Sequence, residues 1–279
     1  MFEKNYYCLV AGLREYALDS ETKGFDAVEI ISQIKEELSA KDLKSLALMQ
    51  CYYDCENIIA LRHSRSAFNP LGNLSREELE AEMEQPRLLP KRIAEVIRAY
   101  AEVEDEEADE ESKMDLSLGF ERSLMKAYYE ECSHSSCRFL REWSEFDRTL
   151  RNVVAAIVAR SLDRSIESVT VGAGSVVEQL HRSSASDFGL RGEIEYLDSV
   201  ITAVNDVQNM VEKEHKIDLI RWEQALQIAF TDYFNINAIL SYVARINIVA
   251  RWTLLDEKRG REMFERIKQE FDGKNHVNK

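Results

Sequence analysis

The residues best suited to chemistry in this chain lie in the cluster CSHSSC, which supplies Cys132, His134 and Cys137. Cysteine and histidine are the ligands that zinc prefers, but a structural zinc site needs a second pair of ligands. Cys51 and Cys55 have i, i+4 spacing, which is more typical of small side chains facing a helical core. The sequence therefore predicts no metal site, and a helical metalloenzyme built on the first cluster is kept as an alternative hypothesis.

No other catalytic constellation stands out. The five histidines are scattered among charged or small polar neighbours. The motif GAGS at 172–175 is not followed by the Lys-Ser/Thr of a phosphate-binding loop, and neither G-x-S-x-G nor H-E-x-x-H occurs. The many carboxylates resemble solvated helix faces, with no evident acid and base pair. We predict no catalytic or cofactor-binding residues and no cofactor, so the chain is not expected to be an enzyme.

Polar residues inside apolar helices are the more informative signal. Three apolar segments, at 46–65, 139–162 and 239–260, carry an embedded Asp or Arg and often an Asn. They suggest an internal repeat, although chance similarity between amphipathic helices is the alternative.

The embedded residues are the predicted contact residues. In the first two segments an aromatic–Asp pair precedes an Asn, three residues on for Asp54 and Asn57 but five for Asp147 and Asn152. These four side chains are expected to cap helices or to bond neighbouring repeats inside the core, with contact to a partner protein as the alternative. In the third segment, Arg245 and Arg251 are expected to pair with acids of neighbouring helices, with contact to a partner protein as the alternative.

The elements that must position these residues are helices. All three prolines lie between positions 70 and 90, and apolar residues recur with a period of about 3.6 throughout the chain. Asp26 is a predicted N-cap, and Ser75 with Glu78 forms a predicted capping box. The all-α prediction places helices at 26–38, 42–63, after Ser75, after Pro90, 113–132, 136–162, 192–214, 217–234, 236–253 and 257–271. The segments NYYCLVAGL and 168–180 are left open between strand and helix.

The predicted domain organisation follows the acidic segment EVEDEEADEE, which holds eight acids and no base. We expect an N-terminal helical unit at 1–100, an acidic linker at 101–112, a second unit at 113–185 and a C-terminal unit at 186–279. Without those eight acids, 43 acids would face 36 bases, a net charge of −7 instead of −15. No basic stripe is present, so we expect no nucleic-acid partner.

The longest apolar stretch, NINAILSYVARINIVARWTLLD at 235–256, raises the question of a membrane span. Arg245 and Arg251 would each cost about 2.5–3.5 kcal/mol at a bilayer centre, so we predict an inner helix of a soluble core with no membrane insertion. The N-terminus lacks the features of a signal peptide, and five cysteines are an odd number for disulfides. A cytoplasmic location is expected.

Two stretches resemble a known family. FLREWSEFDRTLRNVVAAIVARSLDRSIESV is similar to the signature helix of the C/d-type central-stalk family of V-type ATPases, named C-type in archaea and bacteria and d-type in eukaryotes. The residues that fit the pattern there are Phe139, Arg141, Glu142, Asp147, Asn152 and Arg160. The stretch from 217 to 255 is similar to the last repeat of that family, and it fits at Phe234, Leu240, Tyr242, Arg245 and Arg251.

The resemblance has limits. This chain has Asn247 and Val249 where the family favours acids, and Trp252 where it favours Asn. The opening NYYCLVAGLREY also resembles the opening of the C/d-type family. The chain as a whole looks most like a bacterial family of the Bacteroidetes type that is encoded beside V-type ATPase subunits.

The resemblance implies a function without catalysis. The C/d-type family is built of three pseudo-repeated helical units that form a funnel on the membrane rotor ring. The funnel receives the tip of the central stalk and couples ATP hydrolysis or synthesis to ion transport. The implied partners are the central-stalk subunits and the membrane rotor ring of a V-type ATPase. The location would be peripheral to the inner face of the cell membrane. A helical cytosolic adaptor or scaffold unrelated to ATPases is the alternative.

Overall fold

The computed structural model describes residues 4–18, 24–104, 119–205 and 209–254, and every regular element in these ranges is helical. The predicted all-α class is confirmed. The eleven α-helices of the described ranges are α1 (Tyr7–Gly12), α2 (Ala27–Glu37), α3 (Ala40–Arg62), α4 (Arg76–Glu84), α5 (Lys91–Glu104), α6 (Phe120–Ser133), α7 (Arg138–Ser161), α8 (Ser175–Arg182), α9 (Leu197–Asn205), α10 (Met210–Ile228) and α11 (Ile236–Leu254).

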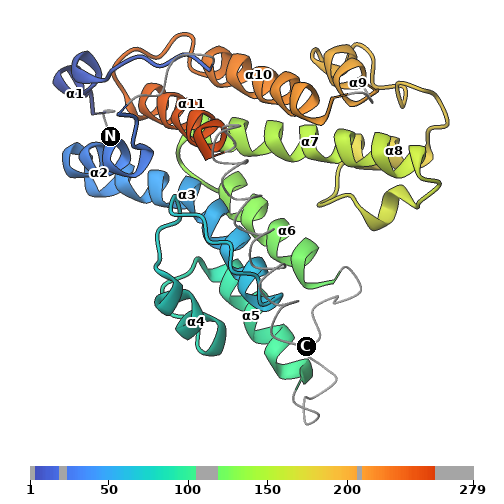
Figure 1. Cartoon of the computed structure of the whole chain (residues 1–279), viewed down its shortest axis with the longest axis horizontal. Helices are drawn as coiled ribbons and strands as arrows, with labels where there is room; N and C mark the ends of the chain where they lie inside the picture. Colours follow the sequence, from blue (N-terminus) through green and yellow to red (C-terminus); the bar gives the residue numbers. More distant parts are fainter. Residues whose placement is uncertain (1–3, 19–23, 105–118, 206–208, 255–279) are drawn as a thin grey trace, which may run out of the picture.

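The helices form two arms (Figure 1). One arm contains α3, α4, α5 and α6, and the other contains α7 with α8 and α9 toward its far end. Helices α10 and α11 pack on each other and on α7, and α11 also contacts α2. The arms are joined where α6 packs on α7.

Local capping explains where several helices begin. The Asp26 carboxylate accepts hydrogen bonds from the backbone N–H groups of Val28 and Glu29, and α4 carries a complete capping box of Ser75 and Glu78. Both predicted caps are confirmed. Such side chains satisfy backbone N–H groups that the first turn of a helix leaves without partners.

Several predicted boundaries differ from the structure. The predicted helices 192–214 and 217–234 are wrong at their junction, because α10 runs unbroken through 210–228. Its N-cap is Asn209, whose side chain accepts from Val211 and Glu212 and so sets the start one turn before the predicted break. The N-terminal segment NYYCLVAGL contains helix α1. The ambiguous segment 168–180 starts at the last residue of a short 3-10 helix (Ile166–Ser168), continues as a loop and becomes helical again at Ser175, where α8 begins.

The predicted acidic linker needs a correction at its start. Helix α5 continues to Glu104, so the first four residues of the predicted 101–112 linker are helical. The rest of that linker lies outside the described residues, as does the predicted helix 257–271. The helix predicted from 113 is described from Phe120 onward.

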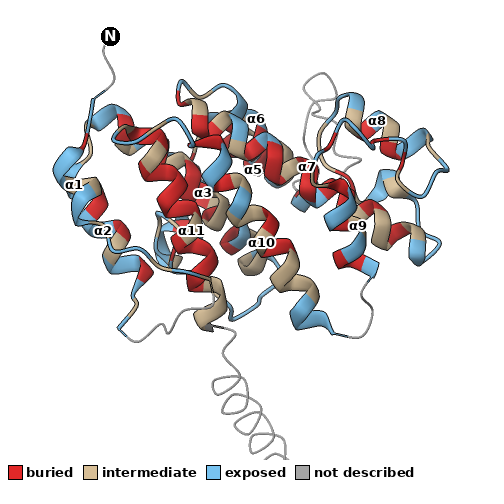
Figure 2. Ribbon diagram, turned by 90° about the horizontal axis from the view of Figure 1, so that it is seen from above, coloured by how far each residue is buried: buried red, intermediate tan, exposed pale blue. Residues whose placement is uncertain are grey.

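Two apolar clusters form the core, and α7 contributes to both (Figure 2). The first cluster joins helices of the N-terminal hundred residues to α6, the start of α7 and α11. The second joins the rest of α7 to α8, α9 and α10, and the Trp143 side chain packs against both clusters. The division into three repeated units stays a prediction, since the described core does not by itself separate three bodies.

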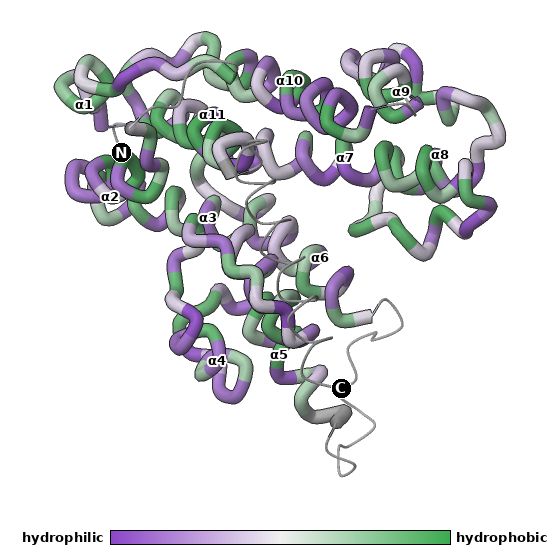
Figure 3. Tube along the Cα trace, in the orientation of Figure 1, coloured by the Kyte–Doolittle hydropathy of each residue, from purple (hydrophilic) through white to green (hydrophobic). Residues whose placement is uncertain are grey.

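Helix α11 is the most hydrophobic long element of the described chain (Figure 3). Its Ile239, Leu240 and Val243 are completely buried within the first cluster. Within the described ranges, none of the helices combines the length and the apolar character that a membrane crossing requires.

Candidate functional site: a charged cleft between the two arms

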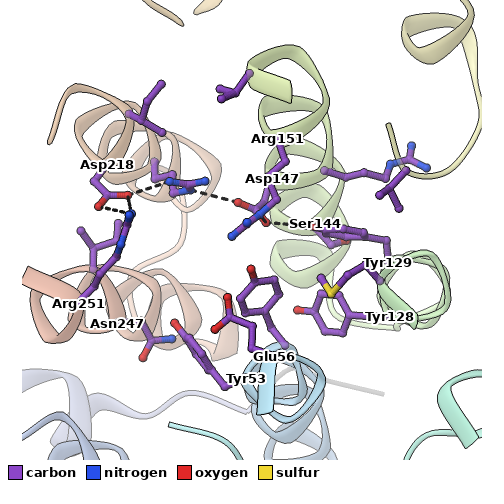
Figure 4. A pocket seen from close by; sticks show the side chains of 18 of the residues that line it. Tyr53, Glu56, Tyr128, Tyr129, Ser144, Asp147, Arg151, Asp218, Asn247 and Arg251 are labelled. Atoms are coloured by element: carbon purple, nitrogen blue, oxygen red, sulfur yellow. Dashed lines mark hydrogen bonds and ion pairs between the residues drawn. The ribbon is translucent and has the colours of Figure 1, made fainter. Parts of the chain in front are cut away.

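A cleft of about 1110 Å³ opens between α3, α6, α7, α10 and α11. Its lining contains four tyrosines, one tryptophan and five arginines, together with apolar side chains such as Met49, Val158 and Ile248. Figure 4 shows side chains from facing helices projecting into it, with Asp147 and Arg151 on α7 opposite Asp218 and Arg251. Tyrosine, tryptophan and arginine are the side chains most enriched among the energetically dominant residues of protein interfaces.

The Asp147 carboxylate is the first centre of an ion-pair network along this cleft. Its Oδ2 accepts hydrogen bonds from the Tyr129 hydroxyl and from Arg151 Nε, both at 2.8 Å. Its Oδ1 accepts from Arg221 Nε of α10 at 3.2 Å. The network thus ties α6 and α7 to α10.

Asp218 of α10 is the second centre, and its side chain is only 2% exposed. It accepts from Arg221 Nη1 at 2.8 Å and from Arg251 Nη1 at 2.8 Å. The indole N–H of Trp252 also donates to it at 2.8 Å. Arg251 additionally pairs with Glu214, so α10 and α11 are joined by charged groups that satisfy one another.

Charge pairing governs the protonation of this network. Burial alone would raise the pKa of Asp147, but the guanidinium groups of Arg151 and Arg221 outweigh it and lower the pKa to about 2. The desolvated hydroxyls of Tyr53 and Tyr129 have pKa values raised above the ordinary range for tyrosine. At neutral pH the cleft therefore presents an ionised carboxylate and neutral tyrosines.

Asn57 and Asn152 each hydrogen-bond to the backbone of the loop that follows their own helix. Asn57 donates through Nδ2 to the Asn69 carbonyl and accepts through Oδ1 from the Asn69 N–H, at 2.9 and 2.7 Å. Asn152 makes the same pair of bonds with the backbone of Val171, at 2.9 and 2.8 Å. Each buried amide thus holds the loop that follows its own helix, and we call the two arrangements the asparagine clamps.

Asp54 supports the first clamp and lies outside the cleft lining. Its Oδ1 accepts from the backbone N–H groups of Asn73 and Leu74, and its Oδ2 accepts from the Asn73 side chain. Burial raises the pKa of Asp54, and these hydrogen bonds oppose the rise. Gly72 leaves room for this contact, since a Cβ there would lie 2.5 Å from Asp54 Oδ1.

Of the six residues singled out from the sequence, the structure brings two into one network, Asp147 and Arg251. Arg251 pairs with acids of the neighbouring helix α10, as predicted. Arg245 instead pairs with Glu15, which lies between α1 and α2, and it does not line the cleft. Its guanidinium lies 5.4 Å from the centre of the Trp222 ring, within cation–π range.

Sequence reasoning missed Asp218 and Arg221, which complete the network. The signal in the sequence was charge at i, i+3 and i, i+4 spacing on partly apolar helices, as in Asp218–Arg221 and Asp147–Arg151. Such pairs are common on exposed helix faces, so spacing alone does not single them out.

The cysteine cluster gives no metal centre in the described residues, where no group of three His, Cys, Asp or Glu side chains is placed to hold an ion. Cys132 and Cys137 are buried, whereas the adjacent His134 is exposed. Burial raises the pKa of the Cys132 thiol, and the Cys137 thiol contacts Asn237 Oδ1 at 3.5 Å. Both behave as core side chains.

Comparison with known proteins gives one match. A family model described as "Protein of unknown function (DUF2764)" matches residues 3–272. The chain belongs to this family. No curated protein and no solved structure is significantly similar to the chain.

In the cleft of this DUF2764 protein, three of the four acidic side chains are held in ion pairs with arginines. A general base works best with a pKa near the operating pH, whereas the pKa of Asp147 is about 2. Asp218 and Glu214 are likewise held in ion pairs with arginines. Aromatic side chains and arginines, which line the cleft from several helices, are the residue types enriched at protein interfaces.

Proposed function

We propose that the chain is a non-catalytic rotor subunit of a V-type ATPase or ATP synthase, which couples the central stalk to the membrane ion-translocating ring. The stalk tip would occupy the cleft between the two arms. The protein would then lie at the inner face of the cell membrane through its complex, without inserting into the bilayer.

The observation that carries the proposal is a large cleft lined by five helices and braced by buried ion pairs. A helix about 10 Å across fills roughly 400 Å³ per turn of about 5.4 Å, so about 1110 Å³ accommodates two to three turns. The Asp147 and Asp218 pairs fix the cleft walls before binding, which reduces the ordering cost of association.

The resemblance to the C/d-type family adds independent support for this partner class. Two of the residues that carry it, Asp147 and Arg251, lie in the network that lines the cleft. The two asparagine clamps give α3 and α7 a common loop-holding device, as expected of related helical units.

The test is co-expression of the full chain with the V-type ATPase central-stalk and ring subunits of the same organism. We expect stable co-purification that is lost when Ala155→Trp fills the cleft from α7. Ala101→Trp, on an exposed position of α5, is the matched control and should bind as the wild type does. Thermal unfolding checks that both variants fold, and absence of binding by the wild type contradicts the proposal.

A helical adaptor unrelated to ATPases is the second candidate. The described core consists of two apolar clusters, whereas three repeated units would be expected to form three clusters. This difference favours the adaptor. Co-purification of the wild type with neither stalk nor ring would favour this candidate.

A further inference from the structure

The cleft differs in charge from the chain that contains it. Six basic side chains line it against four acidic ones, a local excess of two positive charges in a chain of net charge −15. At physiological salt the Debye length is about 8 Å, so an occupant of the cleft senses these nearby charges more than the distant surface acids.

Most of the acids in the cleft are already neutralised. Asp147 and Asp218 each pair with two arginines, and Glu214 pairs with Arg251. In contrast, the side chains of Arg65 and Lys213 have no ion-pair partner among the described residues. The cleft therefore contains cationic side chains that are available to pair with a ligand, and few carboxylates of its own that would pair with them instead.

Two further features of the cleft indicate what kind of molecule binds in it. Apolar side chains of Ile59, Val158 and Ile248 line the cleft from α3, α7 and α11. Asn247 is 7% exposed and donates to Gln50, but its buried Oδ1 has no hydrogen-bond donor in the described part of the chain. The cleft thus combines an apolar surface and unpaired cations with a buried amide oxygen that has no donor in the described part of the chain.

From this combination we infer that the cleft binds an amphipathic helix of a partner protein whose polar face carries carboxylates. Its apolar face would pack on Ile59, Val158 and Ile248, and its acids would pair with Arg65 and Lys213. The inference adds a binding mode to the proposed function. Only the assignment of the bound helix to the central stalk rests on that proposed function. The binding chemistry itself does not depend on the partner being part of an ATPase.

The first experiment measures binding of two helical peptides to the full chain by fluorescence anisotropy. Both carry leucine along one face, and the other face carries glutamate in one peptide and lysine in the other. We expect the glutamate peptide to bind about tenfold more tightly, with an affinity that falls as salt rises. Equal affinity for the two peptides would overturn the inference.

Charge reversal assigns the effect to the cleft. Arg65→Glu with Lys213→Glu should weaken binding of the glutamate peptide about tenfold or more. The matched control, Lys91→Glu with Arg182→Glu, changes the net charge equally at side chains that are 85% and 79% exposed outside the cleft. It should leave the affinity unchanged, and an equal loss in both variants would contradict a local site.

Binding of the central-stalk proteins to the wild type and to the charge-reversal variant distinguishes this inference from the proposed function. If they bind the wild type and the Arg65→Glu, Lys213→Glu variant alike, the acidic-helix inference fails and the rotor proposal stands. If they do not bind but the glutamate peptide does, the rotor proposal fails and the inference stands. Self-association of the wild type that this variant abolishes would identify the occupant as a second copy and overturn the partner helix.

Discussion

Helices α3 and α7 use the same asparagine clamp but place their aspartates on different sides. Asp54 precedes Asn57 by three residues, whereas Asp147 precedes Asn152 by five. At about 100° per residue, the first pair lies about 60° apart around its helix and the second about 140° apart. Asp54 therefore shares the clamp's loop with Asn57, while Asp147 faces away into the cleft.

The difference in spacing gives the two aspartates different bonding partners, loop backbone for Asp54 and arginine side chains for Asp147. In α3 both polar side chains hold the loop at 69–74. In α7 the asparagine alone holds the loop at Val171, which leaves the aspartate to organise arginines.

Asp147→Ala should have the largest effect on folding. It leaves the guanidinium groups of Arg151 and Arg221 without their shared carboxylate. Removing one partner of a buried ion pair, as Asp147 forms with the 13% exposed Arg221, costs about 3–5 kcal/mol. Urea unfolding measures the free energy. A loss below about 1 kcal/mol would show that Asp147 does not organise the network.

Asn57→Asp and Asn152→Asp should each cost about 2 kcal/mol at neutral pH, because a carboxylate cannot donate to the loop carbonyl that the amide binds. The two losses should be similar and additive, since the clamps share no contact. Unfolding of the single and double variants tests this. Markedly unequal losses would break the equivalence of the two clamps.

Acid should affect the two aspartates in opposite directions. The pKa of Asp147 is lowered from 3.8 to about 2 in the folded chain, so its contribution of about 2 kcal/mol is present above pH 3.8 and lost as the pH falls toward 2. The pKa of Asp54 is raised, so its contribution is greatest in acid and declines as the pH rises through the folded value.

The measurement for this contrast is the stability of Asp147→Asn and Asp54→Asn relative to the wild type from about pH 7 to about pH 2. The destabilisation by Asp147→Asn should shrink in acid, and that by Asp54→Asn should grow. Parallel pH curves for the two variants would refute the assigned difference.

The smallest effects are expected at the loop glycines. Gly72→Ala places a Cβ against the fixed carboxylate of Asp54, whereas Gly172→Ala meets the movable end of Arg148 but has a φ of +84°. We expect losses of about 1 kcal/mol for each, steric at the first site and conformational at the second. Gly12→Ala has no neighbour within 4 Å of the new Cβ and is the control. Thermal unfolding compares the three.

Local features of the fold were predictable from the sequence, and distant ones were not. Asp26 and Ser75 could be recognised as caps because their partners lie two or three residues away. Asn209 was missed because apolar residues continue with helical spacing on both sides of it. Helix class follows from periodicity, whereas a helix start depends on a single side chain.

The cleft depends on contacts that span much of the chain. Arg221 lies 74 residues beyond Asp147, and Arg251 lies 33 residues beyond Asp218. A spacing rule cannot supply such partners, because they are set by how α7, α10 and α11 pack. The residues Asp147 and Arg251 were identified as polar sites in apolar helices, but their common network was not.

Helix α7 gives the molecule a mechanical property. Its 24 residues span about 36 Å, and its two ends are anchored in different apolar clusters. We therefore expect core packing at one end of α7 to resist a displacement at the other end, so that the helix does not bend at Trp143. Hydrogen exchange should accordingly protect the amides of α7 uniformly along its central turns.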